Sequence, residues 1–289
     1  MKHLPHIIVV AGPTASGKSD FAVHLALQLS KEQSQDCEII SADSRQIYKG
    51  LDIGTGKITE EEMKGVKHHM IDIVNLQDEF SVARYQELAR PILLDILARG
   101  KTPIICGGTG QYIDALIYSN TFPKSKPDHI LREQLEKKTT PELYEELFAK
   151  DSRRAEMIDM HNRVRLIRAL EIVHSLGAVP IQSAPSLVYT TTIYLMSPTR
   201  ELLRERVRAR LEKRLASGMT EEVKNVLEKG YKGEALKRFG LEYFVIGKYI
   251  EEVITKEHMK EELLNKIMQY AKRQETWNKK YQKSAIIVH

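Results

Sequence analysis

The sequence has little cysteine and no long apolar run, and these shortages exclude several classes of protein. Two cysteines, Cys37 and Cys106, occur in 289 residues, too few for a disulfide scaffold or a cysteine-rich metal site. No apolar run approaches the roughly 18 residues that a membrane-spanning helix needs, and the apolar N-terminal segment lacks a cationic leader. We therefore expect a cytoplasmic protein that does not associate with a membrane.

Charge of either sign is only slightly in excess. Lysine and arginine total 44 against 39 aspartate and glutamate residues, which gives a formal net charge of +5. This mild basic excess permits RNA binding without requiring it. A chain of 289 residues can form one large domain or two modest ones.

A glycine-rich segment near the N-terminus predicts a phosphate-binding loop. It lies between the apolar, β-branched run 6–11 and a stretch with apolar residues at helical spacing, 20–30. The glycines let the backbone turn with its amides inward, Lys18 supplies a charge for a terminal phosphate, and Ser19 offers a hydroxyl to Mg²⁺. An ordinary glycine turn is the alternative. The predicted loop consists of Gly12, Pro13, Thr14, Ala15, Ser16, Gly17, Lys18 and Ser19.

Short apolar runs alternate with helical stretches in the N-terminal part of the chain, which is typical of a parallel sheet. Ligands of open parallel sheets bind at the carboxyl ends of the strands. The phosphate loop, Asp43 and the glycines at 107–110 follow the first, second and fourth runs, so we expect them to converge on one cleft. The predicted strands are Ile7–Val10, Glu38–Ser41, Met70–Val74 and Pro103–Cys106.

The character of the sequence changes at Ser119 and changes back near Tyr189. Two charged stretches, 128–150 and 151–176, predict helices without an intervening strand. The β-branched run 189–195 predicts a further strand, and the rest of the chain is predicted to be helical up to a final strand at 285–288. We therefore predict an α/β fold like that of P-loop NTPases, with a parallel sheet flanked by helices in a core domain of residues 1–118 and 189–289. Residues 119–188 are predicted to form an all-helical insertion domain.

A phosphate-binding loop alone favours a nucleotide hydrolase or a small-molecule kinase, because most such loops bind a nucleoside triphosphate. Asp43 or Asp72, each on or just after a predicted strand, would then hold Mg²⁺. A P-loop kinase of small molecules or nucleotides is therefore the alternative function. A third hypothesis is an RNA-binding module whose loop only grips phosphate.

Five motifs, in order, resemble those of the tRNA dimethylallyltransferases. They are Gly12–Ser19, Ser41–Thr55, Gly107–Thr109, Arg165–Glu171 and Ala271–Trp277, and they span nearly the whole chain. The resemblance implies transfer of a dimethylallyl group from dimethylallyl diphosphate to the exocyclic N6 amine of the adenosine 3′ to the tRNA anticodon. The products would be N6-isopentenyladenosine and pyrophosphate. The loop would then bind the diphosphate together with Mg²⁺, and Ser19 would be the protein ligand of the metal.

The resemblance also implies roles for side chains near the loop. Asp43 would be the general base that takes the proton from the weakly nucleophilic amine, with a helix N-cap or a magnesium ligand as the alternatives. Thr109 would lie near the reacting amine, or would only stabilise the turn at 107–110. Lys18 would stabilise charge on the departing pyrophosphate. Arg206 and Arg210, four residues apart on one predicted helix, would reach the diphosphate, or would only be solvated.

The resemblance further implies that the insertion domain, residues 119–188, binds tRNA. The chain would contact the anticodon stem-loop, from which the target adenosine would be splayed into a pocket. Alternatively, Arg165 and Arg168 pair with Glu171 or Asp159. The implied tRNA-binding residues are Asp43, Ser44, Arg45, Gln46, Thr109, Arg132, Val164, Arg165, Leu166, Ile167 and Arg168.

Two segments near the C-terminus qualify these expectations. Residues 237–249 depart from the sequence of the better-known members, so we carry over no RNA contact there. Trp277 lies on a predicted helix with an apolar stripe and is expected to belong to the core. We expect the protein to be a monomer.

Overall fold

The computed structural model describes residues 4–119, 122–123, 125, 128–181 and 186–289. The chain divides into two compact units: Met1–Ser119 together with Leu187–His289, and Asn120–Ser186. Within the predicted insertion, residues 120–121, 124, 126–127 and 182–185 lie outside the described part. Among the helices described, none combines the length and the apolar character that crossing a membrane requires.

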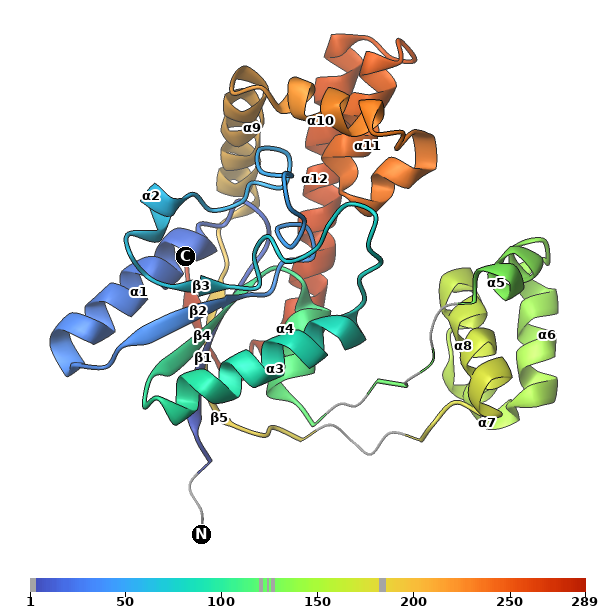
Figure 1. Ribbon diagram of the computed structural model, residues 1–289, viewed down its shortest axis with the longest axis horizontal. Helices are drawn as coiled ribbons and strands as arrows, with labels where there is room; N and C mark the ends of the chain where they lie inside the picture. The colour runs from blue at the N-terminus through green and yellow to red at the C-terminus, as the bar shows by residue number, and fades with distance from the viewer. Residues whose placement is uncertain (1–3, 120–121, 124, 126–127, 182–185) are drawn as a thin grey trace. The chain divides into compact units, whose positions relative to one another are not determined.

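A six-stranded sheet forms the centre of the first unit, counted over the described residues (Figure 1). The strands are β1 (His6–Ala11), β2 (Cys37–Ser41), β3 (His68–His69), β4 (Thr102–Gly107), β5 (Thr190–Met196) and β6 (Ala285–Val288). They lie in the order β3-β2-β4-β1-β5-β6, and every neighbouring pair is parallel. The predicted α/β class with a parallel sheet is therefore confirmed.

The strand predicted at Met70–Val74 is wrong. Strand β3 ends at His69, and Met70 and Asp72 follow with φ angles of 64° and 54°. Left-handed backbone cannot continue an extended strand, and Val74 instead forms an isolated bridge with Tyr48. Met70 and Val74 are buried and Ile71 and Ile73 are half-buried, but the turns between them interrupt the sheet.

Helices cover both faces of the sheet because successive side chains of a strand point to opposite faces. Helices α3 (Val82–Ala98) and α4 (Gly110–Ile117) pack against the face that carries Ile7 and Val9. Helix α1 (Lys18–Gln33) packs against the opposite face, with Ile8 and Val10. The short helix α2 (Glu60–Met63) lies between β2 and β3 in the chain.

The helices that follow β5 form a second core in the same unit. They are α9 (Arg200–Ala216), α10 (Met219–Glu228), the 3-10 helix η1 (Gly233–Arg238), α11 (Leu241–Ile250), α12 (Lys256–Asn278) and the 3-10 helix η2 (Lys279–Tyr281). Phe239 and Tyr243 are fully buried at the centre of this core. Trp277, near the end of α12, is half-buried and packs against the core between the sheet and helices α3 and α4, which confirms its predicted place.

The second unit is helical in its described residues. Its helices are α5 (His129–Glu136), α6 (Thr140–Lys150), α7 (Ser152–Met157) and α8 (Arg163–Leu176). Leu143, Leu147, Leu166 and Leu170 are fully buried among them. This unit therefore has a hydrophobic core of its own.

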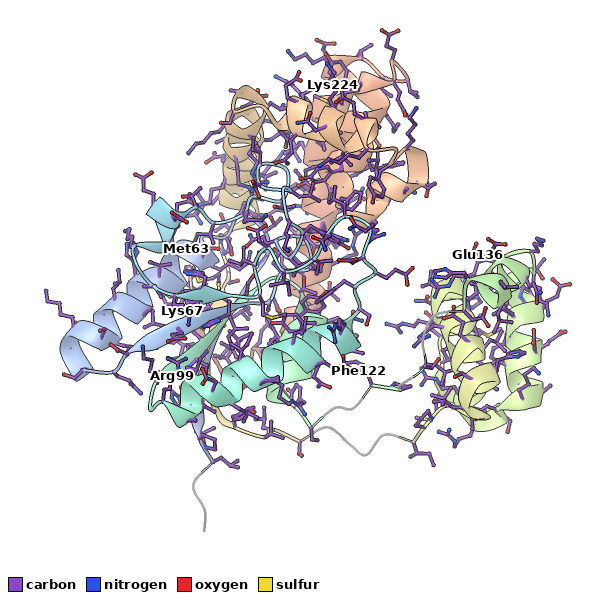
Figure 2. The ribbon with its side chains drawn as sticks, viewed as in Figure 1. Met63, Lys67, Arg99, Phe122, Glu136 and Lys224 are labelled. Atoms are coloured by element: carbon purple, nitrogen blue, oxygen red, sulfur yellow. The ribbon has the colours of Figure 1, made fainter. Side chains whose placement is uncertain are left out.

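A buried carboxylate ties β2 to its neighbours in the first unit. Glu38, 2% exposed, accepts hydrogen bonds from both terminal nitrogens of Arg99 at 2.5 and 2.8 Å. Arg99, at the end of α3, is labelled in Figure 2. His69 Nε2 lies 2.8 Å and Lys101 Nζ 3.2 Å from the same carboxylate. The hydrogen bonds from Arg99 hold the pKa of Glu38 well below its usual value.

We predict that Glu38 makes the stability of the fold depend on pH in the acid range. Because the pKa of Glu38 is lower in the folded than in the unfolded chain, its stabilisation is complete above its ordinary pKa of 4.5 and is lost as the pH falls toward the folded-state pKa. Thermal unfolding of the wild type and of Glu38→Gln, between about pH 7 and about pH 3, measures this contribution. The difference in Tm should be largest near neutrality and shrink with acidification, whereas exposed Glu228→Gln should show no such trend. A difference in Tm that does not change with pH would contradict the prediction.

Candidate active site

The predicted phosphate loop connects β1 to α1. Ala15 and Gly17 have φ angles of 62° and 85°, and these left-handed conformations turn the chain into the helix. The Lys18 Nζ donates to the Pro13 carbonyl across the loop at 3.2 Å. Burial lowers the pKa of Lys18, and the charge of Asp43 opposes that shift. The backbone amides at the start of α1 lack intrahelical partners, so this end of the helix can bind an anion.

Two arginines of α9 reach this loop. Arg206 Nη1 donates to the Ser16 carbonyl at 3.3 Å, while the rest of its side chain stays exposed. Arg210 Nη2 donates to the Thr14 hydroxyl at 2.5 Å. Burial, followed by repulsion from Arg214, lowers the pKa of Arg210 to about 10. Its guanidinium therefore remains cationic at neutral pH. We call Arg206 and Arg210, which both contact the loop, the cationic wall.

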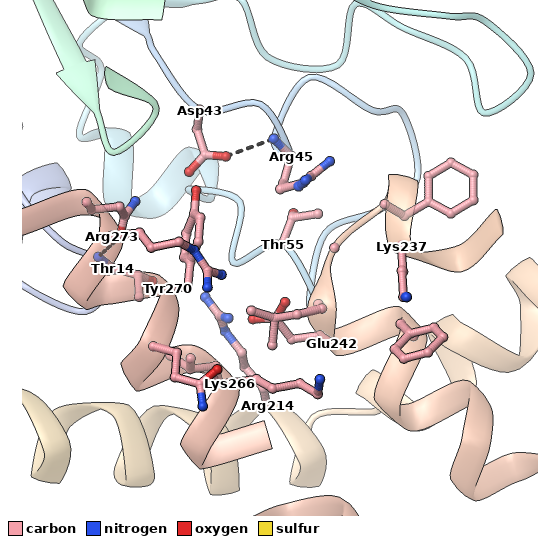
Figure 3. Close-up of a pocket in the computed structure, with 18 of the residues that line it drawn as sticks. Thr14, Asp43, Arg45, Thr55, Arg214, Lys237, Glu242, Lys266, Tyr270 and Arg273 are labelled. Carbon is pink, nitrogen blue, oxygen red and sulfur yellow. Dashed lines mark hydrogen bonds between the residues drawn. The ribbon is translucent and has the colours of Figure 1, made fainter. Parts of the chain in front are cut away.

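Asp43 and Thr109 lie where β2 and β4 end. The Oδ1 atom of Asp43 accepts the Arg45 N–H at 2.8 Å and so closes a tight turn, rather than capping a helix (Figure 3). The Thr109 hydroxyl oxygen accepts the Ser44 N–H at 3.1 Å and donates to the Ser44 hydroxyl at 3.3 Å. A side chain at Gly107 would collide with the backbone that follows β2. The predicted convergence of these segments is confirmed.

Gln274 of α12 joins the phosphate loop to the loop after β4. Its Oε1 accepts the Thr14 N–H at 2.8 Å, and its Nε2 donates to the Gly108 carbonyl at 2.9 Å. The side chain is only 6% exposed, so both backbone groups are satisfied by Gln274 away from bulk water. The sequence did not predict this role for Gln274, although the motif at 271–277 contains the residue.

A cavity of about 370 Å³ lies beside the loop and extends from Lys18 and Asp43 to α11 and α12 (Figure 3). The Tyr270 hydroxyl points toward Asp43 in Figure 3, and burial raises the pKa of Tyr270 to about 12. Glu242 also lines this cavity, and burial raises its pKa, against the opposing charge of Arg214. We name this space the acceptor cavity. Its aromatic and polar lining suits a nucleobase.

Two further cavities adjoin the loop. One of about 70 Å³ is lined by Ser19, Asp43 and Gln46 among others, and one of about 860 Å³ is lined by residues that include Ser19 and Arg206. Lys18 lines all three cavities, whereas Asp43 lines the acceptor cavity and the smallest one. Hydroxyl and carboxylate oxygens are ligands that Mg²⁺ prefers. The donor set of the smallest cavity, with Ser19 and Asp43, therefore fits this metal.

Asp72, the second carboxylate considered for Mg²⁺, is engaged elsewhere. It forms an ion pair with Lys57, whose side chain is 6% exposed and also pairs with Asp52 at 2.5 Å. Asp72 is not among the described residues that line the three cavities. Metal binding by Asp72 therefore stays a prediction, and of the two carboxylates Asp43 is the one that lines cavities beside the loop.

The chain is similar in sequence to known proteins over most of its length. A family model described as IPP transferase matches residues 46–281. The chain belongs to the IPP transferase family. The tRNA dimethylallyltransferase of Exiguobacterium sp. is 39% identical over 96% of this chain and 88% of its own length. The tRNA dimethylallyltransferase of Bacillus subtilis is also 39% identical, over 94% of this chain and 87% of its own length.

Solved structures of the IPP transferase family have the same fold. A tRNA isopentenylpyrophosphate transferase from Bacillus halodurans aligns with a TM-score of 0.70 at 32% identity, covering 98% of this chain and 89% of that chain. A eukaryotic dimethylallyltransferase acting on tRNA aligns with a TM-score of 0.78 at 25% identity, covering 98% of this chain and 73% of that chain. These relatives do not favour the kinase alternative.

The α8 segment that the family resemblance assigned to tRNA contains both exposed and buried residues. Val164 is 77% exposed, and Arg165 beside it is also exposed. Leu166 and Ile167 are 0% and 6% exposed and pack in the core of the second unit. The expected tRNA contact is therefore wrong for the side chains of Leu166 and Ile167, which stabilise the helix packing instead.

Arg132 and Arg168 share one buried partner in the second unit. Arg132 donates two hydrogen bonds of 2.9 Å to the Glu171 carboxylate, and Arg168 donates one of 3.2 Å. The alternative pairing of Arg168 with Glu171 is thus confirmed. The side chains of Arg132 and Arg168 nevertheless remain 40% and 35% exposed, so part of each guanidinium faces solvent.

The remaining tRNA candidates lie after β2 in the first unit. Arg45 lines the acceptor cavity, and its Nη1 donates to the Arg238 carbonyl at 2.5 Å. Gln46 donates to the Gly56 carbonyl at 3.0 Å and lines the smallest cavity. Both side chains therefore also fix the loops around the phosphate-binding segment.

We predict that Gln274→Ala destabilises the fold by about 2 kcal/mol or more, because it leaves a buried N–H and a buried carbonyl without their partner. Chemical denaturation with urea measures this free energy of unfolding. Exposed Glu275→Ala on the same helix is the matched control and should change the free energy of unfolding by less than about 0.5 kcal/mol. Equal free energies of unfolding for Gln274→Ala and the wild type would show that the hydrogen bonds of Gln274 to the two loops do not stabilise the fold.

Proposed function

We propose that this chain transfers the dimethylallyl group of dimethylallyl diphosphate to the exocyclic N6 amine of the adenosine 3′ to the anticodon of a tRNA. Family membership supports the reaction class, since the relatives named above are tRNA dimethylallyltransferases. The observation that carries the proposal is the position of Asp43. It lines the acceptor cavity and also the small cavity that Lys18 and Ser19 share with it.

The diphosphate of the donor binds to the phosphate loop in this proposal. Positive charge lies along one side of the loop, and it comes from the amides at the start of α1, Lys18, Arg206 and Arg210. These groups stabilise the negative charge that accumulates on pyrophosphate as the carbon–oxygen bond breaks. Ser19 would hold Mg²⁺, with Asp43 nearby, and the metal when bound neutralises part of the diphosphate charge.

The adenine enters the acceptor cavity, where Tyr270 and Asp43 face the same space. The N6 lone pair forms a bond to the first carbon of the dimethylallyl group while pyrophosphate departs with the electron pair of the broken bond. The amine then carries an excess proton, which the Asp43 carboxylate accepts. The Arg45 N–H that binds Asp43 at 2.8 Å orients the carboxylate for this step.

The anticodon stem-loop binds to exposed cations in the second unit in this proposal. Arg165 is exposed on α8, and Arg132 and Arg168 present part of their guanidinium groups to solvent. Arginine recognises phosphate oxygens well because its planar group donates two parallel hydrogen bonds. The buried Glu171 keeps two of these arginines together on one surface.

We expect Asp43→Asn to lower the single-turnover rate of transfer at least about a hundredfold, as the loss of a general base does. The amide cannot accept the proton, but it keeps the shape of the side chain. Affinity for dimethylallyl diphosphate, measured by calorimetry, should stay within about threefold of the wild type. Asp95→Asn, 64% exposed on α3, is the control. An unchanged transfer rate in Asp43→Asn would remove Asp43 from the chemical step.

The reaction itself is tested by incubating purified protein with dimethylallyl diphosphate, Mg²⁺ and unmodified tRNA. Mass spectrometry of the digested nucleosides should detect N6-isopentenyladenosine. Incubation with ATP and candidate small molecules tests the kinase alternative in parallel. Failure to form the modified nucleoside on a tRNA that a related transferase modifies would contradict the proposal.

A further inference from the structure

A single carboxylate of α10 receives four hydrogen bonds beside the site. Glu222 accepts the backbone N–H groups of Asp52, Ile53 and Gly54 at 2.7, 2.9 and 2.8 Å. The Tyr243 hydroxyl of α11 donates to the same carboxylate at 2.5 Å. Hydrogen bonds to an ionised acceptor are about twice as strong as bonds between neutral groups. Glu222 therefore anchors the backbone of residues 52–54 to α10 and α11.

The anchored loop, residues 52–56, has no regular secondary structure of its own. Its far end is tied by Gln46, which donates to the Gly56 carbonyl at 3.0 Å, and by the Thr55 hydroxyl, which donates to the Leu51 carbonyl at 2.5 Å. A side chain at Gly54 would come within 2.8 Å of the Tyr243 ring. Backbone in such a loop is positioned by its tertiary contacts, since no helix or strand ladder holds it.

The same loop forms a wall of the site and holds an arginine. Gly54 and Thr55 line the acceptor cavity, and Gly56 lines the large cavity. Gly56 has a φ of 60°, and the Arg214 guanidinium lies so close that any side chain at Gly56 would collide with it. Arg214 lines both of these cavities. Burial is the main cause of the lowered pKa of Lys18, and the charge of Arg214 lowers this pKa further.

We propose that Glu222 is a positioning residue for the diphosphate: it fixes residues 52–56, and that loop holds the Arg214 guanidinium against the phosphate-binding segment. The inference rests on the proposed function, because it takes the ligand of the loop to be a diphosphate. Arg214 joins Arg206 and Arg210 on one face of α9, so the cationic wall has three members. Glu222 touches no reacting atom in this account and acts only through the loop and Arg214.

The test measures binding and turnover separately in Glu222→Gln. The glutamine amide keeps the length of the side chain but removes the charge and presents an NH₂ group to the backbone donors. We expect the Kd for inorganic pyrophosphate with Mg²⁺, from calorimetry, to rise about tenfold, the size of one lost charge-assisted hydrogen bond. The KM for dimethylallyl diphosphate should rise equally, while the KM for tRNA stays within about twofold.

Three variants separate positioning from general stability. Exposed Glu221→Gln, one residue away on α10, should leave the Kd for pyrophosphate and the KM values for dimethylallyl diphosphate and tRNA unchanged. Tyr243→Phe removes one donor but leaves the three loop amides on Glu222, so it should lower Tm with little change in the Kd for pyrophosphate. Gly56→Ala displaces Arg214 without touching Glu222 and should reproduce the Glu222→Gln pattern, which keeps the test valid if Glu222→Gln fails to fold.

The outcomes distinguish this inference from the proposed function. A wild type that does not bind pyrophosphate overturns both. Wild-type binding together with an unchanged Kd in folded Glu222→Gln overturns the positioning role alone, and so does an unchanged Kd in Gly56→Ala. An equal rise in the KM values for donor and tRNA would also overturn it, because that pattern indicates a general distortion of the site.

Discussion

The site depends on bringing the backbone at the ends of three parallel strands into direct contact. Gly107 leaves room for the chain after β2, and Gln274 reaches in from α12 to bond the phosphate loop on one side and Gly108 on the other. Buried backbone groups need such partners. The position of Lys18, Asp43 and Thr109 relative to one another therefore follows from packing of the whole first unit, not from any loop alone.

An excess of positive charge surrounds the phosphate loop. Lys18, Arg210 and Arg214 are all desolvated, and the pKa of each is lowered by that burial. Asp43 and Glu242 offset only part of this charge. Buried cations without enough partners are costly, so an anionic ligand that binds here also stabilises the folded protein. The same imbalance favours the departure of pyrophosphate as a bound anion in the proposed reaction.

Sequence patterns predicted the parts of this structure that local physics controls. The phosphate loop, the strands of the sheet apart from the one placed at 70–74, and the helical second unit follow from apolar periodicity and from glycine and lysine spacing. The strand at 70–74 failed because two left-handed residues interrupt an apolar run. Gln274 and Glu222 were not identified, since their partners lie 260 and 168–170 residues away. Leu166 and Ile167 were assigned to tRNA because resemblance does not reveal which face of α8 is buried.

In the proposed reaction the phosphate loop holds the diphosphate of a prenyl donor while Asp43 faces the attacking amine. A crystal structure with an unreactive thiolodiphosphate analogue of the donor and an anticodon stem-loop tests this directly. We expect the diphosphate to lie on the amides at the start of α1 and to contact Lys18 and Arg210. The Asp43 carboxylate should lie within about 3 Å of the adenine N6 atom. A diphosphate bound away from the loop, or Asp43 turned from an adenine that fills the cavity, would contradict it.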